Sequence, residues 1–338
     1  MLETVWFGIW GVLWAVYFML DGFDLGIGVL QPALVRNEEE RRSAYLAMGP
    51  FWDGNEVWLV AAGGITFAAF PALYAVMFSS FYSVLMLILF GLILRAVSIE
   101  LGEEAEGAVW KGVWRGCLAV ASLLPAFLFG LLFANIFRGI PIDGAGIYHG
   151  TFCTLLNPYG LVGGILFSLL FLLHGALWLS VKTEGLLQTR ASRAALRIWP
   201  AVLVMVAVFL VLTALQTGLY TIYLTRPVLL LIPLVAGAAL IMTRIWIGRA
   251  QWSKAWRASC ASVFSLVMFG VVGLYPTLLP SSLDSAFSLT VHTAASSPTT
   301  LKIMLGVVLV FIPIIVAYQG WVYRFFGGTV DKEMYVKH

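Results

Sequence analysis

Long runs of apolar residues alternate with short polar segments along the whole chain. Crossing a bilayer core of about 30 Å takes about 20 apolar residues in a helix, which rises about 1.5 Å per residue. The apolar runs therefore predict nine membrane-spanning helices. Their approximate ranges are Thr4–Leu30, Phe51–Pro71, Tyr74–Ile99, Val113–Phe137, Pro158–Val181, Ala194–Tyr220, Pro227–Gly248, Ala258–Leu279 and Leu301–Phe326.

The connections between these runs are short. Only a tight turn near Pro71 and Ala72 separates the second run from the third. The longest connections, about Arg138–Asn157 and Leu279–Thr300, leave no room for a separate domain. The N-terminus lacks the basic segment and small-residue cleavage site of a signal peptide, so we expect it to be retained as the first helix. Residues 1–338 are expected to form one transmembrane domain of the all-α class.

Composition agrees with this pattern. Of the 338 residues, 61% are hydrophobic and 11% are charged, whereas a soluble domain carries about 25% charged residues. The three cysteines, Cys117, Cys153 and Cys260, are far apart and form no CxxC pair, which argues against a disulfide framework or a thiolate metal site. We find no phosphate-binding glycine loop, nucleophile triad or nucleic-acid-binding module, and expect no nucleic-acid partner.

The basic residues predict the orientation in the membrane. Nine helices leave alternate connections on opposite sides, and 17 of the 20 Lys and Arg residues fall on one side. The other side carries Arg138, Arg226 and Lys302. Because basic connections stay in the cytoplasm, we expect the N-terminus outside and the C-terminus inside. The predicted cytoplasmic set is Arg36, Arg41, Arg42, Arg95, Lys111, Arg115, Lys182, Arg190, Arg193, Arg197, Arg244, Arg249, Lys254, Arg257, Arg324, Lys332 and Lys337.

The first helix contains two carboxylates, Asp21 and Asp24, in the stretch YFMLDGFDLGIG. Asp24 lies six residues from Leu30, which is about 9 Å from the predicted inner end at the helical rise. The spacing of three places both carboxylates on one side of the helix. Because an ionised carboxylate facing lipid is costly, this side is expected to meet protein or water.

The next two helices add charged residues near the same membrane face. GPFWDGNEVWL at Gly49–Leu59 contains Asp53 and Glu56, again three residues apart. The third helix ends in LILRAVSIELGEE, which places Arg95 and Glu100 nearby. The topology therefore predicts that Asp21, Asp24, Asp53, Glu56, Arg95 and Glu100 converge on the cytoplasmic third of helices one to three.

Two interpretations of this convergence are open. Carboxyl groups linked by water could take protons from the cytoplasm and pass them inward. Alternatively, Asp53 and Glu56 form a capping box at a helix start, and Arg95 neutralises Asp24 or Asp53 in a structural ion pair.

Histidines give a weaker signal. His174 lies mid-helix, where it could ligate haem, but a hydrogen bond to a neighbouring helix is the simpler interpretation. His149 and His292 fall in outer connections and His338 is the last residue. We therefore expect no iron ligand and no other metal site from this chain alone.

Several motifs together resemble subunit II of cytochrome bd-type quinol oxidases. They follow one another in order along all nine predicted helices. They are DGFDLGIG (Asp21–Gly28), GPFWDGNEVWL (Gly49–Leu59), AAGGITFAAFPALYA (Ala61–Ala75), the Arg95 segment, LLNPYGL (Leu155–Leu161), HGALWLSVKTEG (His174–Gly185), YPTLLPSS (Tyr275–Ser282) and SLTVHTAASSPTTLKIM (Ser288–Met304).

The resemblance implies a fold and a role. The fold is two four-helix bundles, about 1–138 and 158–280, plus a peripheral helix at about 301–326. The chain would form a heterodimer with a larger subunit I, with a possible very small accessory subunit, in a bacterial or archaeal cytoplasmic membrane. The complex, and not this chain alone, would oxidise quinol outside, reduce dioxygen to water with cytoplasmic protons, and build a proton-motive force.

The resemblance also implies cofactors and site residues. Two b-type haems and a haem d, or a third haem b, would be held mainly by subunit I, and this chain could hold a structural quinone. Asp24, Trp52, Asp53 and Arg95 match family positions linked to proton delivery and to the haem region. Glu56 stands where relatives can carry Gln, and the tail SIELGEE is more acidic than the family pattern. Helices one to three and the last helix are expected to face subunit I.

Two alternatives remain. A proton-coupled secondary transporter could use Asp24 and Asp53, although such proteins often show broken helices and inverted repeats, and no repeat is legible here. A purely structural partner of subunit I would need no proton path. An Asp53→Asn substitution separates that last alternative from proton delivery.

Overall fold

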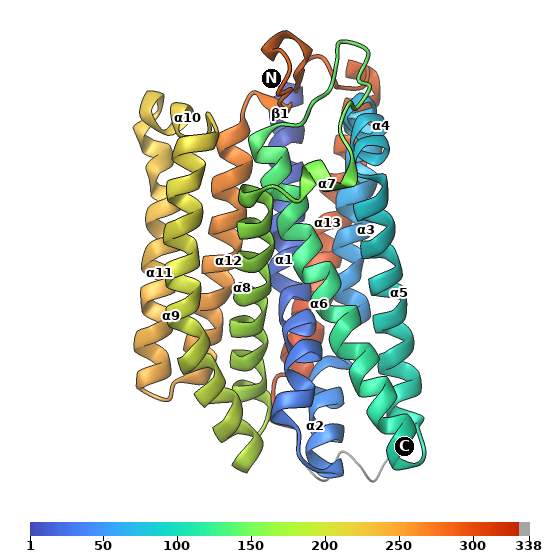
Figure 1. The fold of residues 1–338 in the computed structure, drawn as a ribbon, viewed down its shortest axis with the longest axis vertical. Helices are drawn as coiled ribbons and strands as arrows, with labels where there is room; N and C mark the ends of the chain where they lie inside the picture. Colours follow the sequence, from blue (N-terminus) through green and yellow to red (C-terminus); the bar gives the residue numbers. More distant parts are fainter. Residues whose placement is uncertain (331–338) are drawn as a thin grey trace.

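The computed structural model describes residues 1–330, so the predictions for Lys332, Lys337 and His338 lie outside the described residues. Long helices run side by side along the long axis of the molecule (Figure 1). In chain order the elements are α1 (Leu2–Leu34), α2 (Glu38–Met48), α3 (Trp52–Ala69), α4 (Pro71–Ser80), α5 (Tyr82–Glu104), α6 (Ala108–Arg138), α7 (Phe152–Leu155), α8 (Pro158–Lys182), α9 (Gly185–Gln216), α10 (Tyr220–Thr225), η1 (Pro227–Leu230), α11 (Leu231–Gly248), α12 (Trp252–Leu274), β1 (Thr277–Leu279), η2 (Ser285–Phe287), β2 (Leu289–Thr290) and α13 (Pro298–Phe325).

The all-α class is confirmed, but the count of nine spans is not. Within residues 1–330, eight helices are long and apolar enough to cross a membrane, or up to nine if one bent pair forms a single span. That pair, Glu38–Ala69 and Pro71–Ser80, bends by 118°. Pro71 causes a break here because the residue before a proline is disfavoured in a helical conformation.

Two predicted helix boundaries were wrong. The predicted third helix, Tyr74–Ile99, is two helices, α4 and α5, because the chain breaks at Phe81. The predicted eighth helix extended to Leu279, but α12 ends at Leu274 and Thr277–Leu279 forms β1. This strand pairs antiparallel with β2. Pro276 ends the helix because it lacks the N–H that a further turn would require.

Helix α1 is the central element. It packs against α3, α6, α8 and α12 and runs through the middle of the bundle (Figure 1). Glycines permit this packing, since a Cβ on Gly26 would lie 1.9 Å from the carbonyl oxygen of Phe171 in α8. Small residues let membrane helices approach closely in this way, so α1 is enclosed by protein over most of its length.

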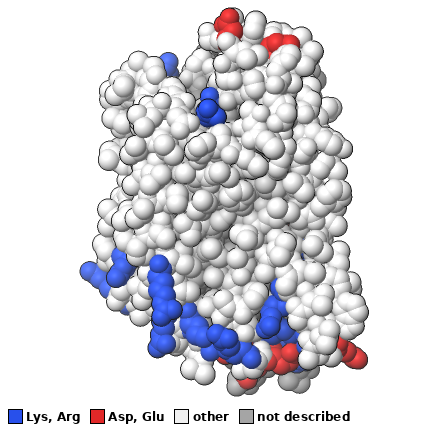
Figure 2. Space-filling view, viewed as in Figure 1, with Lys and Arg blue, Asp and Glu red and all other residues white. Residues whose placement is uncertain are grey.

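Charged side chains gather at one end of the bundle (Figure 2). We call this the basic end; α1, α8 and α13 finish there. Lys182 at the end of α8 donates to the carbonyl oxygen of Phe326, and Arg190 donates to that of Leu34 at 2.7 Å. The other end, where α1 and α13 begin, we call the opposite end. Which end faces the cytoplasm, and the division into two four-helix bundles, stay predictions.

Candidate functional site

A buried ion cluster joins α1, α3 and α5. Asp21 of α1 and Arg95 of α5 are both 0% exposed. Arg95 donates from Nη1 to Asp21 Oδ2 at 3.0 Å, and its Nη2 lies 2.8 Å from Asp21 Oδ1. Arg95 Nη2 also contacts Glu56 Oε1 of α3. The guanidinium is therefore shared by two carboxylates from two other helices.

This arrangement corrects two details of the structural interpretation. Arg95 was expected to neutralise Asp24 or Asp53, but its ion pairs are with Asp21 and Glu56. The predicted capping box is also absent. Helix α3 begins after Phe51 without a side-chain cap. Within residues 1–330, the Asp53 side chain accepts only from the Gly54 N–H, at 2.7 Å.

Asp24 lies one turn beyond Asp21 and is 1% exposed. Its Oδ2 accepts a hydrogen bond from Asn55 Nδ2 at 2.7 Å, while its Oδ1 has no partner within the described residues. Among the described residues Asp24 therefore has no cation of its own, in contrast to Asp21. It is the carboxyl group of the cluster whose charge is least compensated.

Asn55 links Asp24 to the last helix, a connection that the sequence analysis missed. Its Oδ1 accepts from Gln319 Nε2 at 2.9 Å and from the Tyr323 hydroxyl at 2.9 Å. Trp58 of α3 also donates to Gln319 Oε1. Gln319 is the one carboxamide in the apolar helix α13, and that feature was the available signal.

A cavity of about 340 Å³ lies between the start of α3 and α13. Asp53 lines it together with Gln319 and Tyr323. Asp53 is exposed, so it stands beside the cluster and does not take part in its ion pairs. Since the Tyr323 hydroxyl also reaches Asn55, one side chain connects the cavity wall to the hydrogen-bond partner of Asp24.

The remaining predicted site residues lie outside the ion cluster. Trp52, in the first turn of α3, is half-buried. Glu100 is exposed, and its side chain forms no hydrogen bond or ion pair with any residue among 1–330. The structure thus brings Asp21, Asp24, Glu56 and Arg95 together, places Asp53 nearby, and leaves Glu100 outside.

Charge balance indicates what the cluster can do. It contains three carboxyl groups, Asp21, Asp24 and Glu56, and one guanidinium. If all three were ionised, a net negative charge would be buried within the membrane-spanning part of the chain, which is costly. The cluster is therefore suited to hold protons.

Further polar atoms follow α1 toward the basic end. Gln31 lies seven residues, or about two turns, beyond Asp24 and is 0% exposed. Neither side-chain atom of Gln31 has a hydrogen-bond partner in the described part of the chain. Buried polar groups without protein partners are sites that ordered water occupies.

His174 is buried, and both of its ring nitrogens have hydrogen-bond partners. The ring nitrogens of His174 lie 2.9 Å from the Ser259 hydroxyl and 2.9 Å from the Met19 carbonyl oxygen. This is the hydrogen-bonded histidine of the simpler interpretation. Among residues 1–330, no group of three or more His, Cys, Asp and Glu side chains could hold a metal ion.

His149 has a separate structural role in the connection between α6 and α8. Its Nε2 lies 2.8 Å from Asp143 Oδ2. The hydrogen bond with His149, and then those from the Ile147 and Ala145 backbone N–H groups, lower the pKa of Asp143 below its ordinary value. This pair lies at the opposite end, away from the ion cluster; His149 is exposed and Asp143 is half-buried.

Comparisons with known proteins agree with one another. The sequence profile described as "Cytochrome bd terminal oxidase subunit II" matches residues 2–326. The chain is 35% identical over 334 residues to "Cytochrome bd ubiquinol oxidase subunit 2" of Bacillus subtilis, covering 98% of each chain. It is 30% identical over 363 residues to "Cytochrome bd-I ubiquinol oxidase subunit 2" of Escherichia coli K12, covering 98% of this chain and 96% of that protein.

A solved structure has the same fold. A chain of the bd oxidase from Geobacillus thermodenitrificans superposes with a TM-score of 0.76 at 14% sequence identity. The match covers 96% of this chain and 98% of that chain. At this identity the likeness concerns the fold alone.

Proposed function

The chain belongs to the family of cytochrome bd terminal oxidase subunit II, and from this premise we propose that it delivers protons to a quinol-oxidising, dioxygen-reducing complex. Subunit I would hold the b-type haems and the haem d, or a third haem b, and would carry out the redox chemistry. Dioxygen reduction to water consumes protons, so a route from the cytoplasmic side is needed. Family membership decides against the transporter interpretation.

One observation carries the proposal: Asp24 is buried within the bundle and pairs with no cation among residues 1–330. Arg95 is already paired with Asp21 and Glu56. Asp24 can then gain or lose a proton without breaking an ion pair. A buried carboxyl group in a membrane helix marks a functional site by default.

The surroundings of Asp24 suggest a path. Asp53 lines the cavity between α3 and α13 and collects protons near the basic end. Tyr323 and Asn55 connect that cavity to Asp24. Asn55 holds Asp24 in place, since an amide does not carry a proton itself at neutral pH, and water in the cavity completes the transfer. Gln31 offers protons a second route to Asp24, along α1 from the basic end.

The same geometry supports a position for subunit I. Glu56 is 26% exposed, and Asp53 is exposed beside α13. Ionisable groups in membrane helices face protein or water and avoid lipid. We therefore place subunit I against α3, α5 and α13. The chain would stabilise the haem-bearing subunit there, whether or not a very small accessory subunit also binds.

Activity measurements on the assembled complex test the proton route. The variants are Asp24→Asn and Asp53→Asn, with Glu184→Gln as the control because Glu184 is an exposed acid at the end of α8 with no part in the cluster. We expect Asp24→Asn to lower quinol:oxygen turnover about tenfold or more, which is within the range for loss of a positioned proton carrier. Haem content, read from reduced-minus-oxidised spectra, should not change.

Two results would contradict proton delivery. Loss of haem in the Asp24 and Asp53 variants would indicate a structural role, and unchanged turnover would remove these residues from the path. A variant limited by proton supply should also regain turnover as the pH is lowered, because more protons reach the remaining carriers. A structural defect would show no such recovery.

A further inference from the structure

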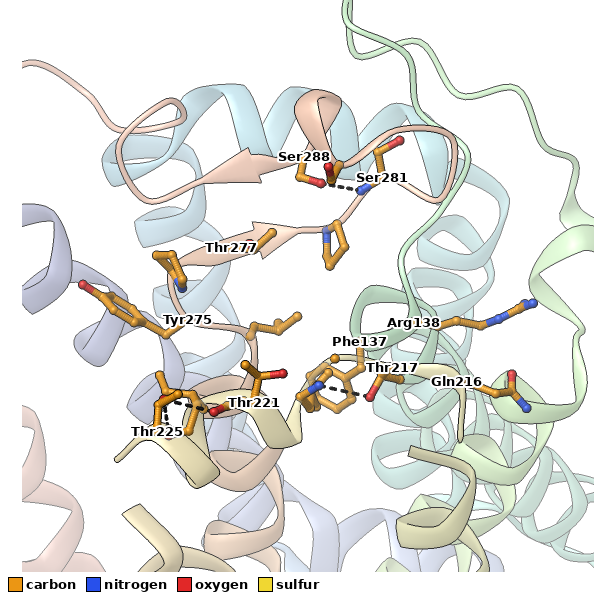
Figure 3. A pocket seen from close by; sticks show the side chains of 18 of the residues that line it. Phe137, Arg138, Gln216, Thr217, Thr221, Thr225, Tyr275, Thr277, Ser281 and Ser288 are labelled. Carbon is orange, nitrogen blue, oxygen red and sulfur yellow. Dashed lines mark hydrogen bonds between the residues drawn. The ribbon is translucent and has the colours of Figure 1, made fainter. Parts of the chain in front are cut away.

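A cavity of about 1010 Å³ opens at the opposite end of the molecule. It lies between the ends of α6, α9 and α12, the short helix α10 and the β1–β2 segment (Figure 3). Arg138 and Gln216 stand on one side of it in this view, and Tyr275 and Thr225 stand on the other. It is remote from the ion cluster near the basic end, so the proposed proton route does not use it.

The cavity concentrates positive charge. Arg138 and Arg226 both line it, and no Asp or Glu among the described residues does. Only Lys302 is otherwise basic among the residues predicted for this side. In Figure 2 the few blue atoms near this end are surrounded by white surface, and the red atoms at this end lie farther out, at its tip. Neither arginine forms a hydrogen bond or salt bridge with its side chain within residues 1–330, so both guanidinium groups are free to bind an anion.

Neutral hydrogen-bond donors accompany the arginines. The side chains of Gln216, Thr221, Thr277 and Ser285 line the cavity. None of them forms a side-chain hydrogen bond within the described part of the chain. Other hydroxyls of the wall are already engaged; Thr217, for example, donates to the Thr213 carbonyl oxygen at 2.7 Å. Guanidinium groups together with hydroxyls are the donors that bind phosphate oxygens.

An apolar stripe leads from the cavity along α9 toward the middle of the bundle. Leu215, which lines the cavity, is 75% exposed. Val211, Val208 and Val204 follow at helical spacing and are 59%, 39% and 60% exposed. Residues three and four apart share one side of a helix. The stripe is therefore a continuous apolar surface that starts at a cationic cavity.

We propose that this cavity binds the phosphate headgroup of an anionic glycerophospholipid, with an acyl chain lying along Val204, Val208, Val211 and Leu215. A headgroup with a net negative charge matches two unpaired arginines. A quinone ring is neutral and would leave both cations without a counter-charge. The site lies at the predicted outer membrane surface, where a headgroup and its chains would meet the cavity and the stripe together.

Native mass spectrometry of the delipidated complex with subunit I tests this site. The probes are phosphatidylglycerol with long chains, dihexanoyl phosphatidylglycerol and inorganic phosphate. We expect the Arg138→Gln/Arg226→Gln variant to bind long-chain phosphatidylglycerol about tenfold or more weakly than the unmodified complex, because charge-assisted hydrogen bonds are lost. Lys302→Gln, which removes a basic residue at the same end but outside the cavity, should not change binding.

The competing outcomes are distinct. Equal binding by the double variant and the unmodified complex would overturn the site. If inorganic phosphate displaces the lipid at equal concentration, the cavity is a site for free phosphate, and the proposed lipid site is wrong. If dihexanoyl phosphatidylglycerol binds as tightly as the long-chain form, the α9 stripe does not bind an acyl chain. Both arginines are exposed, so equal thermal unfolding without lipid should show that the variant folds normally.

Discussion

The side formed by α3, α5 and α13 and the side formed by α9 and α11 both expose long apolar helices. We compared the most apolar 18-residue stretch of each helix. In these stretches 6% of the residues are buried in α13 and 39% in α5, compared with 17% in α9 and 22% in α11. Exposure alone therefore does not separate the two sides. What separates them is the polar chemistry between the helices.

Behind α3 and α13 lie the ion cluster, the carboxyl group of Asp53 and the amide of Gln319. By contrast, the stretch from Ile198 to Gln216 of α9 and the stretch from Leu231 to Thr243 of α11 contain no ionisable residue. Partly exposed ionisable groups need protein or water, so the first side suits a protein partner and the second suits lipid. We therefore base the proposed partner and lipid sides on the polar groups between the helices and not on apolar exposure.

The largest expected difference comes from one arginine on each side. Arg95→Met would leave Asp21 and Glu56 without their shared cation, and removing one partner of a buried pair costs about 3–5 kcal/mol. Arg244→Met on α11 removes an exposed side chain and should change stability by less than about 0.5 kcal/mol. Thermal unfolding of the two complexes checks this. Equal destabilisation by both substitutions would mean that the cluster is not what stabilises the α3 side.

The presence of these two sides was only partly predictable from the sequence. Length and continuity of an apolar run are local properties, so the long helices α1, α6 and α8 lie where the pattern predicts them. A carboxylate within such a run must turn inward, so a buried cluster near Asp21 and Asp24 was also predictable. The break at Phe81 was not, because only Ser79 and Ser80 precede it and neither residue is a strong helix breaker.

The sequence did not show which residue each charged side chain contacts. Residues three apart on a helix point about 60° away from each other, so Asp21 and Asp24 face different neighbours. Which one meets Arg95 depends on the rotation of α1 against α3 and α5, which no single helix pattern contains. The contact of Asn55 with Gln319 and Tyr323 joins positions more than 260 residues apart. Such a contact is set only by the assembled bundle.

A bulky side chain on each side should separate partner contact from lipid contact. Val60 of α3 is 74% exposed and Val235 of α11 is 48% exposed. If subunit I covers α3 as proposed, Val60→Trp would overpack that contact, which costs about 1–3 kcal/mol. Val235→Trp would displace only fluid lipid. We expect co-purification of subunit I to fall for the first variant and not for the second. If equal amounts of subunit I co-purify with both variants, subunit I does not contact α3 at Val60.

The smallest difference lies within α13 itself. The Tyr323 hydroxyl donates to Asn55 at 2.9 Å, whereas Tyr318 is 64% exposed and its hydroxyl forms no hydrogen bond within residues 1–330. Tyr323→Phe keeps the ring and removes one hydrogen bond, which costs about 0.5–1.5 kcal/mol. Tyr318→Phe should cost less than about 0.5 kcal/mol. Because Asn55 orients Asp24, the Tyr323 variant should also lower turnover, measured as oxygen consumption. A loss of stability without any loss of turnover would show that α13 is attached through Asn55 but does not position Asp24.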